Sequence, residues 1–106
     1  MSEKIILTDE EGKTYTLEFT RRSLEIMERR GFDPDALTSK PMTMLPALFA
    51  GAFIAHHPNV SKEKIDYLFA NVENKNGLIE KLARMFAEPI NTLLEQKENA
   101  PVKWAE

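Results

Sequence analysis

The sequence predicts a mainly α-helical protein with an N-terminal β-hairpin, an α+β fold in which about four helices pack around a central apolar helix. Three observations support this prediction: an alternating pattern near the N-terminus, apolar residues at helical spacing further on, and an uncharged stretch from Pro41 to Pro58. A chain of 106 residues is the usual size of one domain. We expect that domain over residues 1–96 and a flexible tail over residues 97–106.

The N-terminal residues predict two antiparallel strands joined by a tight turn. The chain reads KIIL, then TDEEGKT, then YTLEF. Gly12 can adopt the positive φ that tight loops commonly require. Tyr15, Leu17 and Phe19 alternate with polar residues, which gives the second strand one apolar face. A lone hairpin is only marginally stable in water, so we expect this face to pack on helices.

The first helix is predicted by apolar spacing and by a stop signal. The stretch RRSLEIMERRG places Leu24 and Met27 on one side and ends at Gly31, a common helix terminator. The stretch FDPDALTSKP then predicts a loop, because Pro34 disfavours helix at the residue before it.

Two further helices are predicted in the second half of the chain. Ser61 is typical of a helix N-cap and precedes a segment with an apolar side. A last helix is predicted from about Gly77 to Gln96. Pro89 lies inside it and is expected to kink or divide it, because proline lacks the backbone N–H donor and crowds the preceding turn.

The uncharged stretch predicts the central helix, beginning near Thr43 to Pro46 and ending at His57-Pro58. Its apolar run is shorter than the roughly 20 residues that a membrane-spanning helix needs, so we predict that protein covers it rather than lipid. One side carries large apolar residues, the large-residue stripe: Leu45, Leu48, Phe49 and Phe53. Another side carries small residues four apart, the small-residue stripe, which would let a neighbouring backbone come close: Ala47, Gly51 and Ala55.

Two interpretations of this central helix remain open. Other helices and the hairpin could cover it completely within one chain. Alternatively, part of its surface stays open for another subunit or a client helix, since extensive exposed apolar patches usually mark interaction sites. On the second interpretation the large-residue stripe is the partner-binding surface, the small-residue stripe provides close helix packing, and a homo-oligomer is plausible.

The sequence predicts a binding protein rather than an enzyme, with no metal and no cofactor. It has no cysteine, and it lacks the HExxH, glycine-rich phosphate-loop and GxSxG motifs. His56 and His57 would point about 100° apart on a helix, so they are poorly placed to share a metal and are predicted to form a helix-end cap or a surface pair. The DEEG stretch is predicted to be a solvated turn. Because the N-terminus has no secretory apolar segment, we expect a cytoplasmic protein.

One basic concentration lies on the first predicted helix, from Arg21 to Arg30. Arg22 and Arg29 share a side that could contact phosphates. Glu25 lies between them and can pair with Arg29, and the net charge of the chain is −3. A self-compensated surface is therefore favoured, and a small nucleic-acid-binding regulator that uses the Arg21–Arg30 helix is an alternative.

Trp104 lies in a polar, unpatterned stretch with Val102 beside it. Tryptophan is enriched at binding hot spots, so this residue is a candidate docking anchor for a partner. The alternative is that it folds back on its own domain.

The order of these features resembles the small tail assembly chaperones of long-tailed, siphovirus-like bacteriophages and related prophages. Those proteins combine a hairpin ending in a Y-x-L-x-F strand, a helix of L-x-x-M/L-E type that ends at glycine, an apolar helix with an A-G step, and a P-x-V/L-S/T-x-E helix start. The matching residues, within about residues 12–95, are Tyr15, Leu17, Phe19, Leu24, Met27, Glu28, Gly31, Phe49, Ala50, Gly51, Pro58, Val60, Ser61 and Glu63.

The resemblance implies a non-enzymatic helper that binds the long, helical tape measure protein while the tail tube is built around it. It also implies contact with tail tube subunits, made in many members by a longer, frameshifted product. A client rich in apolar helical surface needs temporary cover, which an open large-residue stripe would provide. Aspartate at Phe49 and Phe53 would then abolish client capture without unfolding the domain. Another structural phage component, such as a head–tail connector subunit, is an alternative.

Overall fold

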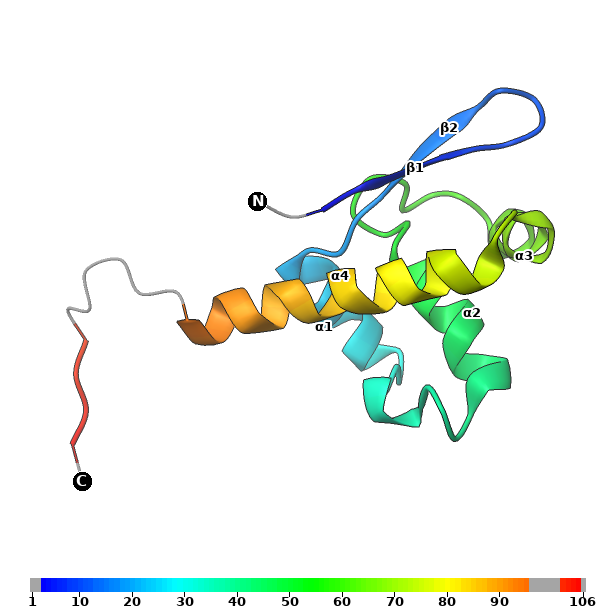
Figure 1. Cartoon of the computed structure of the whole chain (residues 1–106). Helices are drawn as coiled ribbons and strands as arrows, with labels where there is room; N and C mark the ends of the chain where they lie inside the picture. Colours follow the sequence, from blue (N-terminus) through cyan, green and yellow to red (C-terminus); the bar gives the residue numbers. More distant parts are fainter. Residues whose placement is uncertain (1–2, 96–101, 106) are drawn as a thin grey trace.

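A computed structural model describes residues 3–95 and 102–105, and within them two strands precede four α-helices (Figure 1). The elements are β1 (Ile5–Thr8), β2 (Thr14–Leu17), α1 (Arg21–Arg29), the short 3₁₀ helix η1 (Pro34–Ala36), α2 (Pro41–Gly51), α3 (Lys62–Asn71) and α4 (Lys75–Glu95). The predicted α+β fold is therefore confirmed.

Asp9 organises the turn between β1 and β2. Its carboxylate accepts hydrogen bonds from the backbone N–H groups of Glu11 and Lys13, both at 2.9 Å, and from the Tyr15 hydroxyl at 3.2 Å. Gly12 has the positive φ expected of it, +84°. The hairpin is confirmed, but the prediction of a solvated DEEG turn is wrong for Asp9, whose side chain is 3% exposed because it satisfies these donors.

The segment that follows α2 pairs with the outer edge of β2. The His57 ring accepts a hydrogen bond at Nε2 from the Thr16 N–H at 2.9 Å. The Ala52 carbonyl accepts one from the Glu18 N–H at 3.0 Å. The central helix therefore ends at Gly51, earlier than predicted, because the next residues turn to reach the strand.

Both histidines contact the hairpin rather than a helix end. His56 Nε2 lies 2.6 Å from Oε1 of the buried Glu18 carboxylate. Burial lowers the pKa of His57, and the nearby His56 and Lys13 lower it further. The neutral ring is the form that can accept the Thr16 hydrogen bond. The prediction of a surface pair is therefore wrong for His57, which is half-buried, whereas His56 is exposed as predicted.

Local signals determine several helix ends, those at Gly31 and Ser61 as predicted. Thr20 and Ser23 form a reciprocal capping box at the start of α1, with distances of 2.8 and 3.1 Å between each backbone nitrogen and the opposite hydroxyl. Gly31 has a φ of +91° just after α1. The Ser61 hydroxyl accepts a hydrogen bond from the Lys64 N–H at the start of α3.

The fourth helix, α4, is a single helix across Pro89. Of the two effects expected of this proline, a kink or a division, the division does not occur, since the helix continues to Glu95. Leu82, Met85 and Phe86 are buried in the turns before the proline. Packing of that apolar face stabilises the helix and offsets the one hydrogen bond that proline removes.

The central position of α2 is confirmed. It packs against α1, η1, α3 and α4, and its large side chains join those of the hairpin and α4 in one core. Figure 1 shows α4 lying across the middle of the molecule, with the hairpin on one side of it and η1 on the other.

The predicted flexible tail, residues 97–106, lies largely outside the described residues. Of this stretch, residues 102–105 are described; they form neither helix nor strand and are exposed. Within the described ranges, no helix combines the length and the apolar character needed to cross a membrane.

Candidate functional site

Most of the large-residue stripe lies in the core. Leu48 and Phe49 are 0% exposed and Phe53 is 1% exposed, while Leu45 is half-buried. The Phe49 ring packs on the rings of Phe53 and Phe69, with centroids 5.2 and 5.0 Å away. The expectation of an open partner-binding surface at Leu48, Phe49 and Phe53 is therefore wrong, because large apolar side chains gain most from burial.

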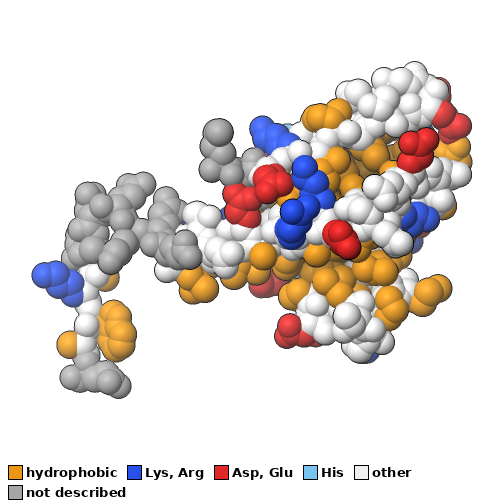
Figure 2. All heavy atoms as spheres, in the orientation of Figure 1, with side chains coloured by type: hydrophobic (Ala, Val, Ile, Leu, Met, Phe, Trp, Pro, Cys, Tyr) orange, Lys and Arg blue, Asp and Glu red, His pale blue; other side chains and the backbone are white. Residues whose placement is uncertain are grey.

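A hollow of about 530 Å³ lies on another side of α2, between this helix, α1 and the segment leading into α3. Six apolar residues that line it define what we call the apolar groove: Ile26, Met27, Met44, Ala47, Ala50 and Ile54. The groove thus follows the side of α2 where the residues are small. On the face seen in Figure 2, hydrophobic side chains also gather below α4, over α2 and its neighbours.

The small-residue stripe is divided between different surroundings. Ala47 and Gly51 line the apolar groove, while the half-buried Ala55 does not. A Cβ on Gly51 would lie 2.3 Å from Sδ and Cε of the buried Met27. Gly51 therefore allows a close approach, as predicted, but the neighbour is a side chain of α1 rather than a backbone.

The rim of the apolar groove is basic. Arg30 and Lys62 line it, and no acidic side chain does. Lys62 donates a hydrogen bond to Asp66 at 2.9 Å, which raises the pKa of this exposed lysine. Arg30 forms no ion pair with any described residue. The groove therefore combines an apolar floor with a positive edge.

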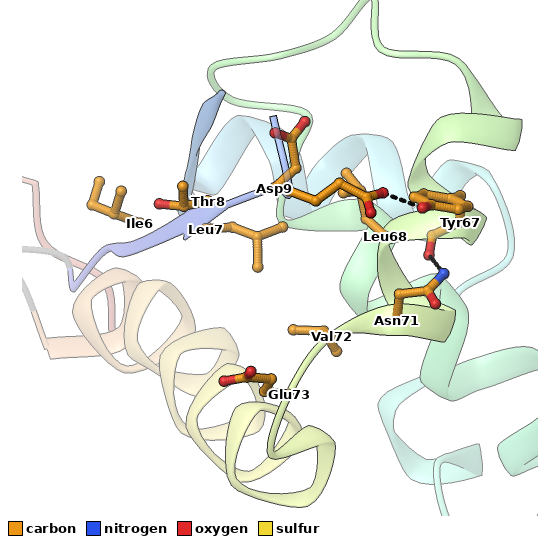
Figure 3. Close-up of a pocket in the computed structure, with 10 residues that line it drawn as sticks. Ile6, Leu7, Thr8, Asp9, Tyr67, Leu68, Asn71, Val72 and Glu73 are labelled. Carbon is orange, nitrogen blue, oxygen red and sulfur yellow. Dashed lines mark hydrogen bonds between the residues drawn. The ribbon is translucent and has the colours of Figure 1, made fainter. Parts of the chain in front are cut away.

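A second hollow, of about 460 Å³, separates β1 and its turn from α3 and the residues that follow (Figure 3). We call it the β1 cleft. Its apolar lining includes Leu7, Leu68 and Val72, and Figure 3 shows Leu7 pointing from β1 toward the space between β1 and Val72. The Tyr67 hydroxyl donates a hydrogen bond to Oε1 of Glu10 across the cleft, which raises the pKa of Tyr67.

The basic concentration on α1 is exposed, and the predicted ion pair between Glu25 and Arg29 is not formed. Arg22 and Arg29 likewise form no ion pair with any other residue in the described ranges. These guanidinium groups therefore face solvent and do not pair with the glutamates of α1.

Trp104 is 86% exposed, and Val102 beside it is also exposed. The alternative that Trp104 folds back on its own domain is therefore wrong for this conformation. Its role as a docking anchor stays a prediction.

Among residues 3–95 and 102–105, no three or more His, Asp or Glu side chains cluster so that they could hold a metal ion. The Glu18–His56 pair lies against the hairpin and stabilises the contact between β2 and the segment after α2. The apolar groove and the β1 cleft are the candidate sites whose linings are mainly apolar.

One family model matches the chain, over residues 1–105, and its description is "Domain of unknown function (DUF5055)". No curated protein and no solved structure matches the chain.

Proposed function

Because the chain belongs to the DUF5055 family, described as a domain of unknown function, we propose its role from its own residues. The proposal is a non-enzymatic tail assembly chaperone of long-tailed bacteriophages or prophages that binds the tape measure protein during tail assembly. It would act in the cytoplasm of the host cell, and tail tube subunits are its second proposed partner. The resemblance of its sequence motifs to those of tail assembly chaperones supports this role, and the apolar groove would supply the binding surface.

The apolar groove is the observation that carries the proposal. Its floor is built from small residues of one helix, Ala47 and Ala50, and from larger residues of the helix beside it, such as Ile26. A valley between two helices is the shape into which an amphipathic client helix places its apolar face. Met27 and Met44 add flexible, polarisable side chains that adapt to different client residues.

The basic residues at the rim of the groove indicate that the proposed client carries negative charge. Arg30 and Lys62 would face acidic residues beside the apolar face of the bound helix, and such complementarity favours association and fixes orientation. We therefore propose that the segment of the tape measure protein that binds here is an apolar helix flanked by aspartate or glutamate.

Binding of tape measure segments to groove variants tests this function. Ala50→Glu places a charge in the groove and should weaken binding about 30-fold or more, as expected for a central contact. Ala83→Glu makes the same change at an exposed site on α4 and should bind normally. Arg30→Glu should weaken binding about threefold, as expected for a rim charge, whereas Arg29→Glu, next to it but outside the groove, should not.

Isothermal titration calorimetry with purified segments measures these affinities, and far-UV circular dichroism checks that each variant is folded. Failure of every tape measure segment to bind the wild-type protein would exclude the proposed function. Equal loss of affinity in Ala50→Glu and Ala83→Glu would exclude the groove as the binding site.

The exposed, unpaired arginines of α1 favour a second candidate, a nucleic-acid-binding regulator. That function requires an affinity for nucleic acid that falls steeply as salt is added. A structural role such as a connector subunit would instead leave the protein in purified virions, where mass spectrometry would detect it; a chaperone should be absent.

A further inference from the structure

Within the part of the chain that the structure describes, no strand pairs with the outer edge of β1. In an antiparallel pair, residues whose N–H and C=O groups point toward the partner strand alternate with residues whose groups point away. The Thr16 N–H points away from β1, since it donates to His57. Ile6 lies opposite Thr16 in the register, so Ile6 and Thr8 turn their backbone N–H and C=O groups to the outer edge.

The β1 cleft runs along this open edge, and its lining is apolar in one part and acidic in another. Leu7, Leu68 and Val72 supply apolar side chains, and Glu73 lies at its border (Figure 3). Glu10 also lines the cleft and adds negative charge. No basic side chain among the described residues is part of the lining, although Lys64 forms an ion pair with the lining residue Asp9 at 3.6 Å. An unpaired edge beside an apolar hollow accepts an added strand that places alternate side chains in the hollow.

We infer that the β1 cleft binds residues 102–105 of a second copy of this chain as an added strand. This segment reads Val-Lys-Trp-Ala, and its two large apolar side chains are strongly exposed in one copy. In an extended strand Val102 and Trp104 point to one face and Lys103 to the other. The segment therefore has the alternation that the cleft requires.

The two faces of this segment match the two sides of the β1 edge. With its backbone paired to Ile6 and Thr8, the strand would direct Val102 and Trp104 toward the apolar wall. Lys103 would then lie on the opposite face, on which the side chains of Ile6 and Thr8 lie, and the Glu10 carboxylate stands at the turn end of the cleft. An opposite-charge pair across two strands stabilises the pairing.

The distance between residues 102–105 and the β1 cleft favours docking in a second copy over docking in the same chain. α4 begins next to the β1 cleft and has 21 residues, so its far end is about 31 Å away at 1.5 Å per residue. Figure 1 shows residues 102–105 beyond that far end, on the side of the molecule opposite α3. Docking in the same chain would need residues 96–104 almost fully extended along α4, whereas a neighbouring copy has no such constraint. Because the segment and the cleft are different surfaces, the contact is head-to-tail and can continue from copy to copy.

Fluorescence of Trp104, the single tryptophan of the chain, tests this inference. As the protein concentration is raised, we expect the emission to move to shorter wavelength while light scattering reports a mass above that of the monomer. Trp104→Ala should weaken self-association about 30-fold or more, as expected for an aromatic anchor. Glu10→Lys should weaken it about fivefold by placing like charges opposite each other. Glu11→Lys makes the same change on the adjacent exposed residue outside the cleft and should have no effect.

A peptide of residues 99–106 provides a second measurement. Added to the Trp104→Ala protein, which has no tryptophan, it should show a blue shift that Glu10→Lys weakens and Glu11→Lys leaves unchanged. Emission typical of exposed tryptophan at every concentration would overturn the inference, as would a blue shift that does not depend on concentration, because that would mean docking within one chain. Equal effects of the two lysine substitutions would place the docking site elsewhere. None of these outcomes depends on the tape measure protein.

Discussion

Replacing Phe49 with alanine should destabilise the fold strongly. Its side chain is fully buried on α2 and packs on the rings of Phe53 and Phe69. Truncating a buried phenylalanine costs about 3–5 kcal/mol. That is a large share of the roughly 5–15 kcal/mol by which a domain of this size is stable.

Urea unfolding followed by far-UV circular dichroism measures this loss. With a slope of about 2 kcal/mol per molar urea, a loss of about 4 kcal/mol lowers the midpoint by about 2 M. Met42→Ala, an exposed site on the same helix, is the matched control and should change the free energy of unfolding by no more than about 0.5 kcal/mol. If Phe49→Ala cost less than about 1 kcal/mol, its ring would not be part of the core and the large-residue stripe would again be the candidate surface.

Two further predictions concern contacts around α2. Gly51→Ala should lower the free energy of unfolding by about 1–3 kcal/mol, because the new methyl group overpacks against Met27. This loss should vanish in a Met27→Ala background. Urea unfolding of the wild type, the two single variants and the double variant measures the coupling, and additive effects would show that the two sites are independent. The pKa of His57 is held below its ordinary value of 6.5 by burial and by His56 and Lys13, so the unfolded chain binds a proton there more readily than the folded protein. The contribution of His57 to stability should therefore be complete above about pH 6.5 and decline as the pH falls below it. Unfolding titrations from pH 7.5 to 5 should show a smaller decline for His57→Gln, which keeps an acceptor but does not titrate; an identical decline would exclude this histidine as the cause.

Elements with a strong local signal could be predicted from the sequence. The alternation from Tyr15 to Phe19, the positive φ of Gly12 and Gly31, and the N-cap at Ser61 each depend on residues close together in the chain. The physical cause of each of these features lies in residues that are close together in the chain, so a single sequence is enough to predict them.

The buried side of α2 could not be predicted from periodicity, because this helix is apolar on several sides. Side-chain size was the available signal: burial of Leu48 and Phe49 removes more apolar surface from water than burial of Ala47 and Ala50. Leu48 and Phe49 therefore enter the core, while Ala47 and Ala50 line the apolar groove together with Met44. The second interpretation therefore places the open surface on the wrong side of the helix.

Other features depend on contacts between distant parts of the chain. α2 ends at Gly51 because Ala52 and His57 accept hydrogen bonds from the backbone of Glu18 and Thr16. The local sequence contains no signal from which these hydrogen bonds could be predicted. The β1 cleft is likewise formed by residues about sixty positions apart, such as Glu10 and Tyr67. Only the three-dimensional fold brings these groups together.

We propose that a helical client binds on the small-residue side of α2. Methyl NMR of the protein, recorded with and without a tape measure segment, tests it most directly. We predict that the resonances of Ala47, Ala50 and Ile54 shift on binding, while those at the far side of the core, such as Leu82, change little. Shifts confined to α1 arginine neighbours or to the β1 cleft, with the groove resonances unchanged, would contradict the account.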